Sequence, residues 1–433
     1  MSKASSVGQA AFNNPFIPLK HRNFRYYWIG MCVSLIGTWM QSVAQPWLAY
    51  SLTNSALLLG LVGAMQYTPA LFLSLFAGVV VDRWPIKRII YFTQASSGLV
   101  VLALALLVYS GEIYYWHILV MAGLMGLVNT LDMPARQAFV VQLVGKDDLM
   151  NAIALNSVAF NTARVIGPAL AGILMAYYGV GICFLINSFS FAAVLISLLF
   201  VVPLPFHIER VARESVWTEL KHGLRYVVEQ RTVLETIVLV AILGIFALNN
   251  NVLLPVFNQE VLLRGERSLG FLFSLAGVGS LFGALTIASL SRTGPRNGVL
   301  YTVPIAIGIL LILVTFSSNF WLAGLYLAAM GFFFNLFSST ANTTVQVYTP
   351  DQLRGRVMSL YTLVFVGTTP LGNLYAGWSC EFWGPQYGFA ACGIMVLVAL
   401  VVLYLLREYA VKRSSETDTI DSSLRGSGSG SGE

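Results

Sequence analysis

The chain has 433 residues, of which 57% are hydrophobic and only 10% are charged, with a formal net charge of +6 and a mean hydropathy of +0.74. A water-soluble protein of this length has no interior large enough to hold that much apolar surface, so the composition excludes a soluble domain. It indicates a protein that crosses a membrane several times, a class in which transporters are the first expectation.

The apolar residues gather in twelve stretches, each long enough to cross a bilayer. A bilayer core about 30 Å thick takes roughly 20 helical residues per crossing. Runs this continuous predict helices, so the expected fold is an all-α membrane protein with twelve transmembrane helices. The predicted spans are 24–52, 55–81, 89–110, 114–134, 151–178, 181–203, 232–257, 268–291, 297–317, 319–345, 357–381 and 385–406.

The basic residues are distributed asymmetrically between the connections of these spans. With the N-terminus placed in the cytoplasm, the inner segments hold 22 of the 25 Lys and Arg residues. The outer loops hold only Arg264 and Arg267, and Arg164 lies within a span. This is the asymmetry of the positive-inside rule. We therefore expect both termini in the cytoplasm, and the net charge needs no nucleic-acid partner.

The two ends of the chain and its cysteines suggest no further site. Residues 1–23 lack the apolar core of a cleavable signal peptide and predict a cytoplasmic segment. The tail 407–433 ends in a Gly-Ser repeat that resembles a remnant of recombinant expression. The cysteines have no metal-like spacing, so we expect buried thiols and neither metal nor cofactor. They are Cys32, Cys183, Cys380 and Cys392.

The longest polar connection, residues 204–231, divides the chain into predicted six-helix bundles at 24–203 and 232–406. Within it, apolar residues recur at helical spacing, from Trp217 to Val228, with Lys221 and other cations on other faces. This predicts an amphipathic helix. It lies either on the inner membrane surface, with its apolar face in lipid, or packed against the ends of the bundles.

The two halves share a sequence pattern at equivalent points. Around the connection of spans four and five the chain has Asp147, Leu149, Gly167 and Gly172, and around the connection of spans ten and eleven it has Asp351, Leu353, Gly372 and Gly377. The pattern indicates a parallel duplication of six helices. Such a duplication places a substrate cavity near the midplane, between the halves.

The inner loop after span two has a distinctive arrangement of Gly78, Asp82, Arg83 and Arg88. The glycine permits close contact between helices, and a carboxylate at the membrane boundary can accept hydrogen bonds from a helix N-terminus or from arginines. The pattern therefore predicts a gate that holds the inner helix ends together. The alternative is a charged loop that only sets topology, with Pro85 forming the turn.

These residues resemble the motif Gly-x-x-x-Asp-Arg-x-Gly-Arg/Lys-Arg/Lys of the major facilitator superfamily. Pro85 and Ile86 stand where the second glycine and the first basic residue are usual. The resemblance therefore covers Asp82 and Arg83 better than it covers the turn of the loop. The equivalent loop of the second half keeps Arg292 and Arg296 but has no Asp. The resemblance therefore implies one strong gate.

Further segments resemble the bacterial exporter branch of this superfamily that includes the enterobactin exporter. They are Gly37–Gln41, Trp47–Tyr50 with Ser55, Asp132–Ala138, Asn161–Gly172 and Leu353–Met358. The resemblance runs over residues 15–410. It implies export across the bacterial inner membrane, a small-molecule substrate, no enzymatic activity and a monomer, and it adds Arg136 and Arg356 to the gate.

Gly167, Pro168 and Gly172 also resemble the fifth-helix motif of drug–proton antiporters, although Ala163 and Ala171 replace two of its glycines. Pro168 removes a backbone donor, and the small residues allow close packing against a partner helix. This predicts a seam that repacks between two states. A plain packing seam with no direction attached is the alternative.

Two charged residues are candidates for proton coupling. Arg164 lies in hydrocarbon and should face the cavity, where it contacts an anionic or catecholate-like group or controls a carboxylate; otherwise it is a hydrogen-bond hub with Asn156 or Asn161. Asp132 is the leading carboxylate, but its position near the inner end of span four fits a gating ion pair with Arg136 at least as well.

Polar residues within spans predict the cavity wall, together with Trp39, which can stack on an aromatic solute. Because neighbouring residues on a helix step by about 100°, three consecutive asparagines cannot share one face, and we expect an unwound turn before Pro255. The polar residues are Gln41, Gln45, Gln66, Asn129, Asn249, Asn250, Asn251, Asn335, Asn342 and Asn373.

The predicted function is proton-coupled export of a small amphipathic molecule, a siderophore or a drug-like compound, by alternating access. The solute class comes from the resemblance. The alternative is a facilitator that moves no proton, or a lysophospholipid flippase, of the same fold. The chain has no Walker A motif and no HExxH or GxSxG signature, so neither ATP hydrolysis nor an intramembrane enzyme is expected.

Overall fold

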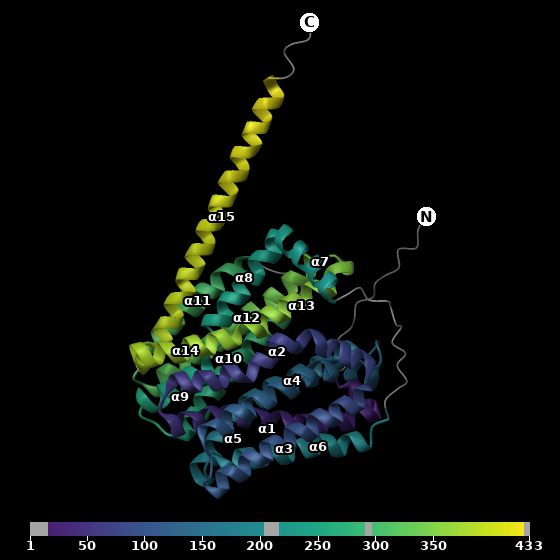
Figure 1. The fold of residues 1–433 in the computed structure, drawn as a ribbon, viewed down its shortest axis with the longest axis vertical. Coiled ribbons are helices and arrows are strands. Elements are labelled where there is room, and N and C mark those ends of the chain that lie inside the picture. The colour runs from purple at the N-terminus through teal and green to yellow at the C-terminus, as the bar shows by residue number, and fades with distance from the viewer. Residues whose placement is uncertain (1–15, 203–215, 291–296, 428–433) are drawn as a thin grey trace.

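A computed structural model describes residues 16–202, 216–290 and 297–427, and these parts are helical with no strand. The expected cytoplasmic segments at 1–15, 204–215 and 428–433 lie outside the described residues, as do Arg292 and Arg296. The helices form two six-crossing bundles, which confirms the predicted all-α fold (Figure 1).

The first bundle has one unbroken helix for each crossing. Helix α1 packs on α5 and α6, α2 packs on α4, and α3 packs on α4 and α6. The helices follow the short 3-10 turn Ile17–Lys20 and are α1 (Arg22–Thr53), α2 (Ala56–Arg83), α3 (Ile86–Ser110), α4 (Tyr115–Val144), α5 (Leu149–Tyr178) and α6 (Gly181–Leu199).

The second bundle has two interrupted crossings. One is broken at residues 247–249, where the sequence predicts an unwound turn, and the other at Thr368, just before Pro370. The helices are α7 (Val216–Glu229), α8 (Arg231–Phe246), α9 (Asn250–Glu260), α10 (Glu266–Leu290), α11 (Asn297–Thr315), α12 (Phe320–Val347), α13 (Asp351–Gly367), α14 (Thr369–Trp383) and α15 (Gly388–Ser427), with a 3-10 turn at Pro385–Tyr387.

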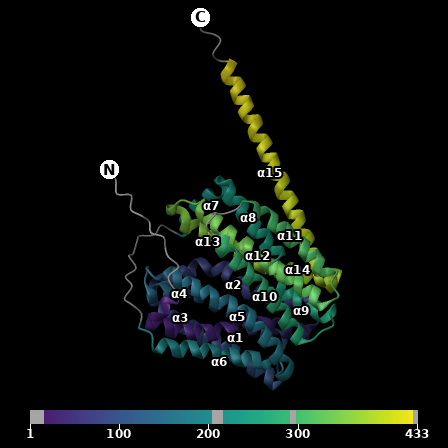
Figure 2. The ribbon, with the colours of Figure 1, turned by 180° about the vertical axis from the view of Figure 1, so that it is seen from behind.

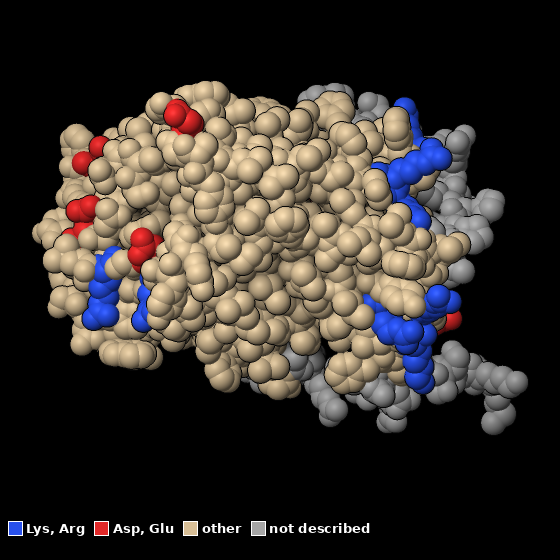
Figure 3. All heavy atoms as spheres, turned by 90° about the horizontal axis from the view of Figure 1, so that it is seen from below, with Lys and Arg blue, Asp and Glu red and all other residues tan. Residues whose placement is uncertain are grey.

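Eleven stretches of the described chain are long and apolar enough to span a membrane, and α1 is the predicted crossing that does not reach this hydropathy. Its 32 residues are sufficient in length. The helix tolerates polar residues because it packs between α5 and α6, where they face protein. Charged side chains gather at two opposite ends of the molecule and leave an uncharged band between them (Figure 3).

The two bundles meet near α9 and α14 and diverge toward α7 (Figures 1 and 2). We name these the outer and inner ends, after the orientation expected from the charge asymmetry. Extensive contacts between the halves join α5 to α10 and α2 to α14, with smaller ones between α2 and α13 and between α9 and both α1 and α2. In the described residues, α4 has no comparable packing with α12 or α13.

The linker helix α7 packs on α13 at the inner end. The Tyr226 hydroxyl donates a hydrogen bond to the carbonyl of Tyr348 at 2.6 Å, and Val227 is buried. Leu224 and Val228 remain more than half exposed. One face of the helix is therefore covered by protein, while two apolar side chains are left for the membrane surface.

Candidate functional site

Hydrogen bonds hold the two halves together at the outer end. The Tyr50 hydroxyl of α1 donates to Glu260 at the end of α9 at 3.1 Å. Glu381 of α14 accepts from the Ser55 hydroxyl at 3.0 Å and from the backbone N–H of Leu57 at 3.3 Å. Glu381 therefore caps the N-terminus of α2, where a carboxylate is favoured by the helix dipole. We call these contacts the outer latch.

The interface between α5 and α10 is formed by close backbone approach. A Cβ atom on Gly172 would lie 2.9 Å from both the Glu266 carbonyl oxygen and the Gly270 Cα. Further along, the Ser274 hydroxyl donates to the carbonyl of Val165 at 2.7 Å. All these contacts fall in the outer halves of the two helices. Gly172 of the predicted seam thus packs across the halves.

The other two predicted seam residues have different neighbours. A Cβ atom on Gly167 would meet Trp39 of α1, so this glycine packs within the first bundle. Pro168 lies inside α5, and a Cβ atom on Gly270 of α10 would meet its carbonyl oxygen. The motif therefore joins α5 to helices on both sides.

The predicted gate residues lie at the inner end, where the two bundles diverge (Figure 1). A Cβ atom on Gly78 would have no neighbour within 4 Å. Asp82, Arg83 and Arg88 are exposed, and Arg356 is half-buried beside α7. Together with the outer latch, this describes a conformation that is closed at the outer end and open at the inner end.

Arg164 lies near the middle of α5, beside aromatic side chains. Its guanidinium carbon is 5.6 Å from the centre of the Trp39 ring, a cation–π contact, and the Trp39 ring packs edge-on against Phe160 at 5.4 Å. In the described chain no carboxylate lies within ion-pair distance of this guanidinium. Its backbone carbonyl adjoins Gly277 of α10, which places the residue at the interface of the halves.

Asn161, which the alternative interpretation placed in a hydrogen-bond hub with Arg164, has a different partner. Asn161 is buried and donates to the carbonyl of Ser157 at 2.8 Å. Arg164 and Trp39 are therefore a cation and an aromatic surface at mid-membrane that an anionic aromatic solute would complement.

Asp132 faces the inside of the first bundle. Its Oδ1 accepts from the Thr93 hydroxyl at 2.5 Å and from the Gln94 amide at 2.9 Å, and its Oδ2 accepts from the Arg136 Nε at 2.5 Å. Asp132 as a whole is 6% exposed. Asp132 and Arg136 thus join α3 to α4 within one half, and neither reaches toward the second half as a gating pair would.

Two of the predicted cavity residues also face the bundle interior. The buried Gln41 accepts from Asn187 of α6 at 2.5 Å and donates to Gln45 at 3.0 Å. Because α6 lies beside α1, these polar groups bind one another in place of water. This differs from the expected position on the cavity wall.

The remaining predicted cavity residues occupy several positions. Asn373 is 2% exposed and adjoins Gly60 and Gly63 of α2, so it lies in the outer contact between the halves. Asn249 is buried and donates to the Ile245 carbonyl at 2.7 Å at the break between α8 and α9. Asn129 is exposed, and the half-buried residues are Gln66, Asn250, Asn251, Asn335 and Asn342.

A charged cluster at the inner end of the second bundle was not predicted from the sequence. Glu235 of α8 is 8% exposed, accepts from Arg231 at 2.8 Å and from the Tyr301 hydroxyl, and lies 3.6 Å from Arg407 of α15. The sequence signal that could have identified it is the spacing of four residues between Arg231 and Glu235, which places opposite charges side by side on a helix. Within the described residues, no group of three potential ligands could hold a metal ion.

Known proteins resemble this chain along nearly its full length. A family model described as a transmembrane secretion effector matches residues 13–424. The chain is 27% identical over 391 residues to the staphyloferrin A transporter of Staphylococcus aureus (strain NCTC 8325 / PS 47), covering 88% of this chain and 96% of that protein. It is 26% identical to the enterobactin exporter EntS of Shigella boydii serotype 4 (strain Sb227), with 89% and 92% covered.

A further relative and two solved structures that match most of the chain are also named as transporters or as homologues of transporters. The multidrug efflux pump Tap of Mycolicibacterium fortuitum is 27% identical, with 86% of this chain and 92% of that protein covered. A bacterial homologue of the lysosomal transporter Spinster has a TM-score of 0.69 at 12% identity, with 90% and 95% covered. A bacterial homologue of the iron transporter ferroportin has a TM-score of 0.66 at 18% identity, with 88% and 98% covered. The chain therefore belongs to the transmembrane secretion effector family of the major facilitator superfamily, and it is a multi-pass membrane transporter.

Proposed function

We propose that this transporter exports a small amphipathic molecule, a siderophore or a drug-like compound, across the bacterial inner membrane by proton-coupled alternating access. The observation that supports it best is the position of Arg164 and Trp39, at mid-membrane beside an interface that is closed at its outer end. A solute that enters from the cytoplasm reaches this pair before the outer latch opens.

The chemistry of the pair favours an anionic aromatic solute. A guanidinium without a carboxylate partner in the described chain attracts a carboxylate or catecholate oxygen, and the Trp39 and Phe160 rings offer a stacking surface. Relatives named as exporters or transporters of siderophores and drugs support the same class of solute. A monomer is sufficient, because both halves of the interface belong to one chain.

Proton coupling is best placed at the outer latch. Glu260 and Glu381 are carboxylates that accept hydrogen bonds across the moving interface, whereas Asp132 is enclosed within one half. Protonation from the outer side removes the charge-assisted part of these bonds and weakens the closed outer end. A proton taken up there promotes outer opening, which couples proton entry to solute release.

Inverted membrane vesicles test this proposal. With an acidic lumen, vesicles that contain the protein should accumulate a catecholate siderophore, and a protonophore should abolish the accumulation. Arg164→Gln should weaken binding of the anionic solute by roughly tenfold, as expected for loss of one charged hydrogen bond, with partial rescue by Arg164→Lys.

The exposed cation Lys221 provides a matched control, since Lys221→Gln removes one charge on α7, far from the mid-membrane pair. Uptake whose rate is unchanged after both the proton gradient and the membrane potential are collapsed would instead support the facilitator. Movement of lysophospholipid without siderophore transport would support the flippase.

A further inference from the structure

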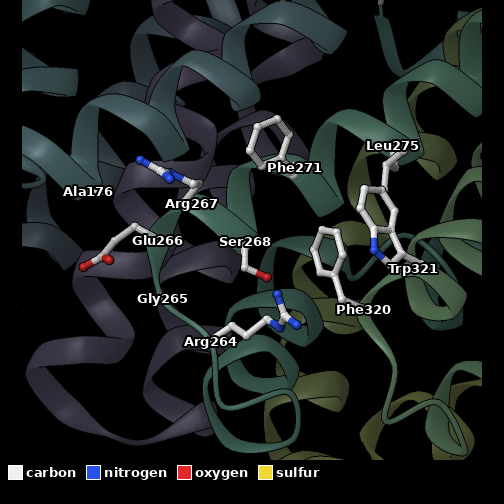
Figure 4. Close-up of a pocket in the computed structure, with 10 residues that line it drawn as sticks. All are labelled: Ala176, Arg264, Gly265, Glu266, Arg267, Ser268, Phe271, Leu275, Phe320 and Trp321. Carbon is white, nitrogen blue, oxygen red and sulfur yellow. The ribbon is translucent and has the colours of Figure 1, made fainter.

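A pocket of about 590 Å³ opens at the outer end, beside the N-termini of α10 and α12. Its polar lining includes Arg264, Arg267 and Ser268, and its apolar lining includes Phe271, Phe320 and Trp321 (Figure 4). The two arginines are the only Lys or Arg residues that the expected topology places in outer loops. Because outer loops of inner-membrane proteins are poor in such residues, their presence together in one pocket needs a specific explanation.

The pocket presents hydrogen-bond donors to a single space. The Arg264 guanidinium lies 5.1 Å from the centre of the Phe320 ring, and no carboxylate of the described chain is within ion-pair distance of it. The Ser268 hydroxyl oxygen is buried and has no hydrogen-bond partner among these residues. In Figure 4 the hydroxyl and the guanidinium point into the same space, whereas the Glu266 carboxylate points to the opposite side.

The loop that carries Arg264 is held in a fixed and unusual conformation. The wholly buried Asn258 donates through its side-chain amide to the carbonyls of Arg264 and Gly265 at 2.8 and 3.1 Å, and the Arg264 N–H donates back to the Asn258 carbonyl at 2.9 Å. Leu263 adopts a φ of +51°, a conformation that costs a leucine energy. A buried clamp and a strained residue therefore position this arginine.

The apolar wall of the pocket continues onto the surface that faces lipid. Trp321 is 73% exposed, and Leu325, one turn further along α12, is 63% exposed. Exposed tryptophans are typical of the membrane–water interface. The pocket thus joins an end that holds a guanidinium and a hydroxyl to an apolar track that runs along α12.

We propose that this pocket binds a phosphate oxyanion, supplied by the headgroup of an anionic lipid in the outer leaflet. Arg264 and Ser268 bind the phosphate oxygens, and an acyl chain follows Trp321 and Leu325. A free phosphate would use the donors but not the track. Ala176 of α5 belongs to the same pocket, and Arg267 contacts the Tyr177 ring at 5.2 Å, so a bound lipid bridges both halves and favours the closed outer end.

Lipid titrations of the full-length protein in detergent test this proposal, with binding followed by native mass spectrometry and by the thermal unfolding midpoint. Phosphatidylglycerol should bind and raise the midpoint, while phosphatidylcholine and inorganic phosphate should do so far less. Arg264→Gln should weaken phosphatidylglycerol binding by about tenfold. Ser268→Ala should weaken it by less, and Arg264→Lys should restore part of it.

The control Lys221→Gln removes one exposed cation at the inner end and should leave phosphatidylglycerol binding unchanged. Because Arg264 is exposed, its variants should unfold at the parent midpoint when no lipid is added. Equal binding of phosphatidylcholine, or parent-like binding by Arg264→Gln, would overturn the proposal. Inorganic phosphate that protects as well as phosphatidylglycerol would show a soluble anion to be the ligand, and would overturn the lipid assignment.

Discussion

The outer and inner ends of the interface between the halves use similar residue types in opposite ways. At the outer end Gly172 and Gly270 bring two backbones into contact, and Glu381 caps a helix of the other half. At the inner end Gly78 has nothing within 4 Å of the position of a Cβ atom, and Asp82 is exposed. The space beside the inner glycine is therefore not used in this conformation, as expected if the inner end closes only when the outer end opens.

The largest effect is expected from a side chain placed in the outer seam. In Gly172→Leu the Cβ atom meets backbone of α10, which cannot rotate away, and overpacking of this kind costs about 1–3 kcal/mol or more. The population with a closed outer end should fall by tenfold or more. Spin labels at Ser110 and Phe316, exposed at the outer ends of the two halves, should move apart when measured by double electron–electron resonance.

Gly298→Leu is the matched control for that variant, because a Cβ atom there has no neighbour within 4 Å and the residue lies away from the interface. Its label distances should equal those of the parent. A Gly172→Leu protein that keeps the parent distances would show that the contact between α5 and α10 does not hold the outer end closed.

The comparison of the ends also shows what the sequence could establish. Hydropathy and the run Asn249–Asn251 before Pro255 predicted the crossings and the broken seventh one. They could not predict that Gln41 faces Asn187 of α6, because an almost wholly apolar helix has no amphipathic direction when lipid and bundle interior are both apolar. Which polar residues face the cavity is decided by partners distant in sequence.

The two buried carboxylates illustrate the same limit. Asp132 stood out as the leading carboxylate near the inner end of span four, but its partners Thr93 and Gln94 lie on another helix, almost forty residues earlier. Glu235 has a local partner in Arg231 and still depends on Tyr301 of α11. Both residues tie helices together within one half, so neither sits at the interface that changes between states.

An intermediate effect is expected from the outer latch. Glu381→Gln keeps the shape of the side chain but removes its charge, which weakens the cap on α2 by about 1 kcal/mol, or roughly fivefold in the population of the closed outer end. The outer label pair should show a second, longer distance. If protons act here, the variant should also lose part of the response of transport to a pH gradient.

Glu112→Gln is the control for the latch, because Glu112 is an outer carboxylate that accepts a hydrogen bond from the Tyr114 hydroxyl of its own half at 3.5 Å. It should leave both the distances and the pH response unchanged. A Glu381→Gln protein with full proton-driven transport would remove this carboxylate from the coupling mechanism.

The smallest effect on the conformation with a closed outer end is expected from changes at the inner gate. Such changes should alter the rate of transport and not this conformation. Gly78→Leu adds a side chain with no neighbour to displace and removes a glycine from the interior of α2, so the free energy of unfolding should not fall and should rise by at most about 1 kcal/mol. Solute binding from the inner side should equal that of the parent. Transport by Gly78→Leu should nevertheless fall, because the leucine obstructs the approach of the inner helix ends. Asp82→Asn should also lower transport, because it weakens the closed inner gate. Spin labels at Lys146 and Asp351 report on the inner end. In the double variant Gly78→Leu/Gly172→Leu they should stay far apart, although Gly172→Leu opens the outer end. If they approach as closely as in Gly172→Leu alone, Gly78 has no part in closing the inner end.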